Sequence, residues 1–296
     1  MKKHRKKRRF SIADLIIKLV IGILALVSIY PFYQTIILSL SREGDKYRNA
    51  VYIFPIHIDF SAYTFLLNEG KVVSGLMVTL FITIVGTLLS LALTIPAAYA
   101  LTKKNMPGRN LLMNLIIFTM FFSGGLVPYF ITIKNLGLID NIAVLILPGA
   151  VNTFNLILMK NFFKDLPASL EESAKLDGAS NFTVLLRIVV PTSKPIIAAI
   201  SLFYAVDRWN EWWNAMLFIN DSSKFPLQLV LRNAIVNMGT IFNNTSALEK
   251  MQKMGNAYTE SVQNAIIVIA AIPILMVYPF VQKHFASGIM MGSLKE

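Results

Sequence analysis

Residues 165–195 read DLPASLEESAKLDGASNFTVLLRIVVPTSKP, and this stretch decides how the rest of the chain is interpreted. Ser169, followed three residues later by Glu172, has the spacing of a capping box and predicts the start of a helix. Glu171 and Glu172 then lie in the first turn, where the helix dipole favours negative charge. The stretch is therefore predicted to open with a short helix that is polar rather than apolar.

The same stretch continues through a glycine corner. Gly178 is placed to end the first helix, Ser180 can cap a second helix, and Pro191 should limit that second helix. An ordinary cytoplasmic helical hairpin would show the same capping pattern. Small residues would also let another surface approach closely, and acidic residues could pair with a basic groove, which suits a docking site for a cytoplasmic partner. These small and acidic residues are Glu171, Glu172, Ser173, Ala174, Asp177, Gly178 and Ala179.

On both sides of this stretch the chain is strongly apolar. Of its 296 residues, 55% are hydrophobic and 15% are charged, whereas a soluble domain carries roughly 25% charged residues. A helix needs about 20 mainly apolar residues to cross a bilayer. The sequence therefore predicts an all-α membrane protein with six transmembrane helices. The predicted spans are 15–41, 74–102, 110–133, 142–162, 196–219 and 263–283.

The formal net charge of +12 is concentrated at the N-terminus, where Lys2–Arg9 read KKHRKKRR. Such a run can bind nucleic acid, but ahead of an apolar chain it is typical of a cytoplasmic anchor beside anionic lipid headgroups. A cleaved signal peptide has an apolar region of about 7–15 residues. The run Leu19–Leu40 is longer, which predicts an uncleaved first span. Basic residues in the remaining short segments place both termini in the cytoplasm. The predicted divisions are a basic tail at 1–13, a first span and outer loop at 14–73, a core at 74–285 and a C-terminal tail at 286–296.

The segment from Glu172 to Pro191 resembles the EAA loop of ABC importer permeases. The family pattern is Glu-Ala-Ala, then Asp-Gly-Ala, then Ile and Pro at a fixed distance. The matching positions here are Glu172, Ala174, Asp177, Gly178, Ala179, Ile188 and Pro191. The chain departs from the pattern at Ser173, where the family usually has Ala. Residues 121–140 and 203–213 are similar to the branch that takes up complex oligosaccharides, as is the C-terminal KHFASGIMMGSLKE.

This resemblance implies a permease fold with a cytoplasmic coupling helix, in the bacterial cell (inner) membrane, that moves a sugar or oligosaccharide. The implied partners are a second homologous permease, an extracytoplasmic solute-binding protein, the lipid bilayer, and two ATPase subunits that hold ATP and Mg²⁺. The chain lacks a GxxxxGK[ST] phosphate loop of its own, and we expect no enzyme activity, cofactor or nucleic-acid partner. A permease for peptide or phosphate stays open. An ion-coupled secondary transporter would instead predict intramembrane charges and no docking loop.

Polar residues inside predicted spans are candidates for a transport route. The candidates are Asp207, Asn210, Glu211 and Asn214 in the fifth span, and Asn152 and Asn155 in the fourth. The four in the fifth span recur at helical spacing, which predicts one shared face, and Arg208 can offset the charge of Glu211. They could line a water-filled cavity or only pair with neighbouring helices. Gly124, Gly125 and Pro128 predict a bend in the third span. The chain has no cysteine and three widely separated histidines, so no metal site is predicted.

Overall fold

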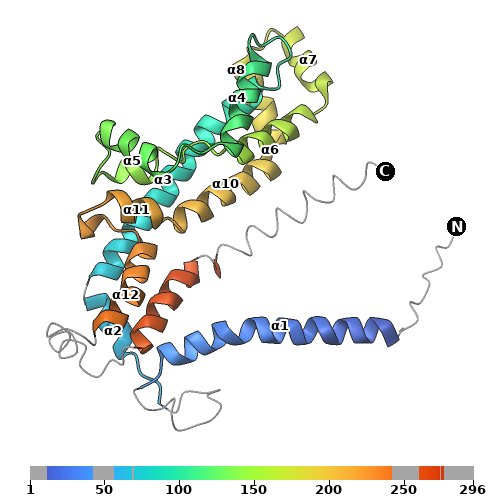
Figure 1. Ribbon diagram of the computed structural model, residues 1–296. Helices are drawn as coiled ribbons and strands as arrows, with labels where there is room; N and C mark the ends of the chain where they lie inside the picture. The colour runs from blue at the N-terminus through green and yellow to red at the C-terminus, as the bar shows by residue number, and fades with distance from the viewer. Residues whose placement is uncertain (1–11, 43–56, 69, 242–259, 274, 277–296) are drawn as a thin grey trace. The chain divides into compact units, whose positions relative to one another are not determined.

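A computed structural model describes residues 12–42, 57–68, 70–241, 260–273 and 275–276 (Figure 1). Every regular element in these ranges is a helix. The predicted C-terminal tail at 286–296 and residues 1–11 of the predicted N-terminal tail lie outside the described residues. The chain forms two compact units, one from 1–68 with 237–269 and one from 69–236 with 270–296. Each unit is described by itself.

The first unit contains the long helix α1 (Ile12–Ser39). Its stretch Leu15–Ser39 is long and apolar enough to cross a membrane, and its most apolar part is 0% buried within the protein. One helix thus occupies the predicted first span at 15–41, and its crossing of a membrane stays a prediction. The short helix α2 (Ser61–Asn68) begins where Asp59 Oδ1 accepts the Ser61 backbone N–H at 2.8 Å. The two helices are joined by a 2.7 Å hydrogen bond between the hydroxyls of Ser39 and Tyr63.

The second unit is built around α3 (Lys71–Ala100). This helix packs mainly against α10 (Lys194–Trp209) and α6 (Thr153–Lys164). Small and hydroxyl side chains recur along its buried side at intervals of four residues, or of seven where Ile82 intervenes. They are Gly75, Thr79, Gly86, Ser90, Thr94 and Ala98. Small residues let helix backbones approach closely, and such interfaces are typical of helix packing in membranes.

The predicted third span is a bent pair of helices. It consists of α4 (Arg109–Phe121) and α5 (Leu126–Asn135), which meet at 118° across a break of four residues. Gly125 in this break has φ of +87°, a conformation that a residue with a Cβ rarely adopts. The bend predicted from Gly124, Gly125 and Pro128 is confirmed, and a straight third span is wrong.

The predicted fourth span at 142–162 is wrong as a continuous helix. The 3₁₀ helix η2 (Ile142–Leu145) is followed by a non-helical segment that runs to Asn152. Pro148 lies in this segment and has no backbone N–H to continue a helix. The Asn152 side chain then caps α6 by accepting the backbone N–H of Asn155 at 3.1 Å.

The predicted fifth span at 196–219 is also interrupted. Helix α10 ends at Trp209, and the short helix α11 (Trp213–Phe218) follows after three residues. At its other end, α10 meets the helical run 181–192 at 85°. That run consists of α8 (Asn181–Val184), the π-helix η3 (Leu185–Val189) and α9 (Val190–Thr192). The run ends at Thr192, one residue beyond Pro191, so Pro191 limits the run nearly as predicted. The wider π turn just before the proline allows this one further residue.

Within the described residues, two helices are long and apolar enough to span a membrane, Leu15–Ser39 and Lys71–Ala100. The number rises to four if each bent pair counts as one span. Shorter helices complete this part of the chain: η4 (Ser222–Lys224), α12 (Leu227–Ile241) and a helix at Glu260–Pro273. The predicted sixth span at 263–283 is described only as far as residue 276. The count of six spans therefore stays a prediction.

Candidate coupling site and transport route

The polar stretch between the predicted fourth and fifth spans forms the helix α7 (Ala168–Leu176), at one end of the second unit (Figure 1). Its N-cap is Pro167, which makes no side-chain cap. Ser169 lies inside the first turn, so the predicted capping box is wrong. The ring of Pro167 fixes φ at −58° and sets the helix start two residues earlier than the sequence pattern suggests. Glu171 lies in the first turn, as predicted.

The glycine corner after α7 is confirmed in detail. Gly178 has φ of +82°, and its N–H donates to the Lys175 carbonyl at 3.0 Å while the Ala179 N–H donates to the Ala174 carbonyl at 2.9 Å. This pair of bonds is the Schellman motif, which needs a left-handed residue at the position of Gly178. Ser180 then caps α8 by accepting the Thr183 N–H at 3.2 Å.

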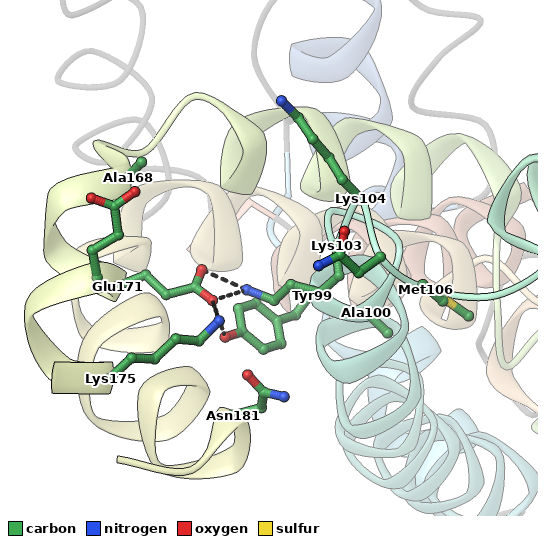
Figure 2. Close-up of a pocket in the computed structure, with 11 residues that line it drawn as sticks. Tyr99, Ala100, Lys103, Lys104, Met106, Ala168, Glu171, Lys175 and Asn181 are labelled. Carbon is green, nitrogen blue, oxygen red and sulfur yellow. Dashed lines mark hydrogen bonds and ion pairs between the residues drawn. The ribbon is translucent and has the colours of Figure 1, made fainter. Parts of the chain in front are cut away.

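The carboxylate of Glu171 ties α7 to the end of α3 (Figure 2). It accepts hydrogen bonds from the ammonium group of Lys103, from Lys175 at 2.9 Å and from the Tyr99 hydroxyl at 3.4 Å. The Lys103 Nζ also lies 3.8 Å from the centroid of the Tyr99 ring, a cation–π contact. Burial raises the pKa of Glu171, but hydrogen bonds from Lys103 and Lys175 outweigh it and hold the pKa below its usual range. We refer to these four side chains as the Glu171 cluster.

A groove of about 820 Å³ opens beside the Glu171 cluster. Its walls come from the end of α3, the loop that follows α3, and α7 (Figure 2). Besides the cluster itself, the exposed side chains of Lys104 and Glu172 line this groove. Its walls thus carry charges of both signs.

The six residues predicted to contact an ATPase divide into two groups. Ala174 and Ala179 pack against the protein's own apolar core, and Glu171 belongs to the internal cluster. Three are exposed, namely Glu172, Asp177 and Gly178. The structure adds Leu176, which the sequence analysis missed and which is 90% exposed. An apolar side chain held in the open beside carboxylates gives α7 a mixed surface on which another protein can pack.

The shared polar face predicted for the fifth span is wrong, because the helix ends at Trp209 and a new one begins at Trp213. Glu211 accepts hydrogen bonds from the backbone N–H and the Nδ2 of Asn214, both at 2.9 Å. The Tyr129 hydroxyl of α5 donates to Asn214 Oδ1 at 2.9 Å. The break therefore places Glu211 and Asn214 in a network with α5.

Asp207 and Asn210 remain exposed near the end of α10. Asn210 Nδ2 donates to the Val206 carbonyl of the same helix.

Arg208 and Glu211 form no direct ion pair, although their opposite charges interact at longer range. The Arg208 side chain is 3% exposed, and its guanidinium donates to the carbonyls of Leu145 and Ile146 at 2.8 and 2.9 Å. A Cβ placed on Gly149 would lie 3.0 Å from its terminal nitrogens, and one on Gly86 would lie 3.1 Å from Nε. Arg208 therefore fills the space between α3 and the non-helical segment before α6, and satisfies the carbonyls at the end of η2.

A hollow of about 290 Å³ lies between the start of α6 and the last turns of α10. The structure thereby brings together three of the six predicted route residues and leaves out Asn210, Glu211 and Asn214. The residues that line it are Asn152, Phe154, Asn155, Phe203 and Asp207.

Behind this hollow, a buried tyrosine holds α6 in place. The Tyr204 hydroxyl accepts the Asn152 backbone N–H at 3.1 Å and hydrogen-bonds the Thr94 hydroxyl of α3 at 2.8 Å. Sequence reasoning missed Tyr204 because a lone tyrosine in an apolar run carries no signal of its partners. No group of His, Asp and Glu able to hold a metal ion occurs in the part of the chain that the structure describes.

Long apolar helices, broken helices that hold polar groups, and an exposed polar corner are features of a membrane transport subunit. Residues 90–291 match the family described as the inner membrane component of binding-protein-dependent transport systems, and the chain belongs to this family. It is 46% identical to the protein LplC of Bacillus subtilis (strain 168) over 279 residues, covering 94% of this chain and 92% of LplC.

Two further proteins are similar over nearly the whole chain. The polygalacturonan/rhamnogalacturonan transport system permease protein YtcP of the same organism is 41% identical over 274 residues, which are 92% of this chain and 94% of YtcP. A bacterial ABC transporter involved in the import of the acidic polysaccharide alginate has a solved structure with a similar chain. That chain has a TM-score of 0.86 and 36% identity, and the match covers 94% of this chain and all of that one.

Proposed function

We propose that this chain is the permease subunit of an ATP-driven importer that moves a sugar or oligosaccharide into the cytoplasm. We propose further that α7 is the coupling helix on which a partner ATPase docks. The observation that carries this proposal is that α7 has one side chain anchored to the protein and others exposed. Glu171 anchors the helix to α3 from within, while Glu172, Leu176 and Asp177 are presented outward.

The proposed assembly follows from the family. A second homologous permease completes the pathway, two ATPase subunits bind ATP and Mg²⁺, and an extracytoplasmic solute-binding protein delivers the cargo. The chain would cross the bacterial cell (inner) membrane six times with both termini in the cytoplasm. Three basic residues at this corner support a cytoplasmic position for it: Lys175 in α7, and Lys103 and Lys104 in the loop after α3.

The relatives favour a saccharide over a peptide or phosphate, because YtcP and the alginate importer are both named for polysaccharides. An ion-coupled transporter is less well supported. Such a transporter has no ATPase partner that an exposed apolar side chain such as Leu176 would contact. For the route itself, we propose the hollow at Asn152, Asn155 and Asp207, and the neighbouring break that holds Asn210, Glu211 and Asn214.

Gly178→Trp tests the docking of the ATPase. None of the residues that the structure describes lies within 4 Å of a Cβ at Gly178, so Trp would obstruct a partner rather than this part of the fold. A residue with a Cβ is strained there by the positive φ, and Gly137→Trp is the matched control because Gly137 also has a positive φ and open space.

We expect both variants to insert into the membrane. The Gly178 variant should lose ATP-driven uptake and co-purification with the ATPase, while the Gly137 variant keeps both. Normal uptake by Gly178→Trp would rule out α7 as the docking helix.

A further inference from the structure

The hollow between α6 and α10 combines three kinds of side chain that together bind sugars: amides, a carboxylate and aromatic rings. We infer that this hollow is a subsite for one neutral, hydroxylated sugar ring, and that it disfavours a ring that carries a carboxylate. This inference rests on the proposed function and adds a site and a charge preference to it.

The first argument is an amide without a partner. Asn155 is 5% exposed and lines the hollow, and no hydrogen bond reaches its side-chain amide from the described residues. The amide atoms themselves are not enclosed by the protein, so they face the open space of the hollow. An amide both donates and accepts, as a sugar hydroxyl does, so a bound hydroxyl would satisfy it.

The second argument is a fixed donor beside this amide. The Oδ1 of Asn152 is occupied by the N–H of Asn155, and its backbone N–H is bound to the Tyr204 hydroxyl. The Nδ2 of Asn152 is left to donate to a ligand. Because both bonds fix the residue before any ligand arrives, little conformational freedom is lost on binding.

The third argument concerns charge. Asp207 is the one ionisable side chain among the residues that line the hollow. The neighbouring guanidinium of Arg208 is directed to the carbonyls of Leu145 and Ile146, so it does not line the hollow. A carboxylate accepts hydrogen bonds from sugar hydroxyls but repels a sugar carboxylate at close range. The acid groups of an acidic cargo must therefore be held elsewhere in the importer.

The fourth argument concerns shape and surroundings. Phe154 and Phe203 contribute aromatic walls, and the negative face of an aromatic ring suits the C–H face of a sugar. A volume of about 290 Å³ is at the small end for ligand sites, which fits one ring rather than a chain. A charged group such as Asp207 on a span is costly in lipid, so the hollow faces water or protein.

The test compares a neutral sugar with a sugar that carries a carboxylate. The chain has no cysteine, so Phe154→Cys places a single thiol in the hollow while Phe203 and the polar residues stay. The complete importer, reconstituted in liposomes, is labelled with a small water-soluble thiol reagent. The probes are methyl galactoside and galacturonate at equal concentrations. Phe182→Cys, which replaces an exposed residue outside the hollow, is the control reporter.

We expect methyl galactoside to slow labelling of the Phe154→Cys reporter about 3–10-fold, the effect of one or two net hydrogen bonds, and galacturonate to have little effect. Adding Asp207→Asn, which keeps the shape and removes the charge, should let the two sugars protect equally. Labelling of the Phe182→Cys reporter should not change.

Equal protection by both sugars with Asp207 intact, or no protection by either, would overturn the inference. Failure of the proposed function would look different, because the unmodified importer would then take up no saccharide from any loaded binding protein.

Discussion

Replacing Glu171 by Gln should loosen α7 from the end of α3. The change keeps one acceptor but removes the charge that Lys103, Lys175 and the Tyr99 hydroxyl all contact. Hydrogen bonds to charged groups contribute about 1.5–3 kcal/mol, whereas fully exposed ion pairs contribute about 0.2–1 kcal/mol. The side chains of Lys103 and Glu171 are 24% and 28% exposed, so an intermediate loss of about 1–2 kcal/mol is expected. A loss of that size raises the population of opened α7 by a factor of about 5–30.

Hydrogen exchange of the amides in α7 measures this opening directly. Glu172→Gln is the matched control, because Glu172 is the next residue, is exposed, and makes no hydrogen bond or ion pair with the described residues. We expect exchange in α7 to accelerate about 5–30-fold in the Glu171 variant and to stay unchanged in the Glu172 variant. Lys103→Met should have a similar effect, and the double variant should be little worse than either single one. Equal exchange in the Glu171 and Glu172 variants would refute the anchoring role.

The same cluster has a defined pH dependence. Because the pKa of Glu171 is lowered in the folded protein, its stabilising effect is complete above the ordinary glutamate value of about 4.3. The effect is lost as the pH falls through the lower folded-state value. The difference between wild type and Glu171→Gln, corrected for intrinsic exchange, should therefore be constant from about pH 6 to 8 and shrink only below about pH 4.

Two further variants test the packing behind the transport route. Tyr204→Phe leaves the Asn152 N–H and a buried hydroxyl of α3 without their partner, and should lower the free energy of unfolding by about 1–3 kcal/mol, seen as a lower Tm of the purified complex. Gly149→Ala places a Cβ 3.0 Å from the bonded nitrogens of Arg208 and should cost about 1–3 kcal/mol by overpacking. Gly124→Ala, whose Cβ meets its nearest neighbour at 3.9 Å, should be nearly neutral; equal Tm values for the two alanine variants would contradict this account.

Features that depend on neighbouring residues in the chain were predictable from the sequence. The apolar run Leu15–Ser39 had to span or be buried, and it forms one helix. The corner at Gly178 and the cap at Ser180 follow from local hydrogen-bonding chemistry, and both are present. The bend around Gly124 and Gly125 belongs to the same class, because it needs a positive φ that glycine supplies.

Pro148 is a local signal for the break in the fourth span, but the break in the fifth span was not predictable in the same way. No residue type in the run from Trp209 to Trp213 is a helix breaker. In the structure this run is not helical, and the Glu211 carboxylate accepts hydrogen bonds from the backbone N–H and from the side-chain Nδ2 of Asn214. The two terminal nitrogens of Arg208 donate to carbonyls of a segment some 60 residues earlier. Counting residues at helical spacing assigns Asp207, Asn210, Glu211 and Asn214 to one face of one helix. The structure instead places them on α10, in the break that follows α10, and on α11.

These distant contacts share one element, the helix α3. Its end provides Tyr99 and contacts α7 through the Glu171 cluster, and its middle provides Gly86 against Arg208 and Thr94 against Tyr204. From Thr94 to the end of α3 is six residues, about 9 Å at the rise of an α-helix. A movement of α7 that displaces α3 along its axis therefore acts on the Tyr204 hydroxyl, and through it on the start of α6 where the hollow begins. In this arrangement a docking event at the proposed coupling helix α7 and the shape of the proposed sugar subsite are connected by one helix and two hydrogen bonds, one buried and one partly buried, which is a contiguous physical route for coupling.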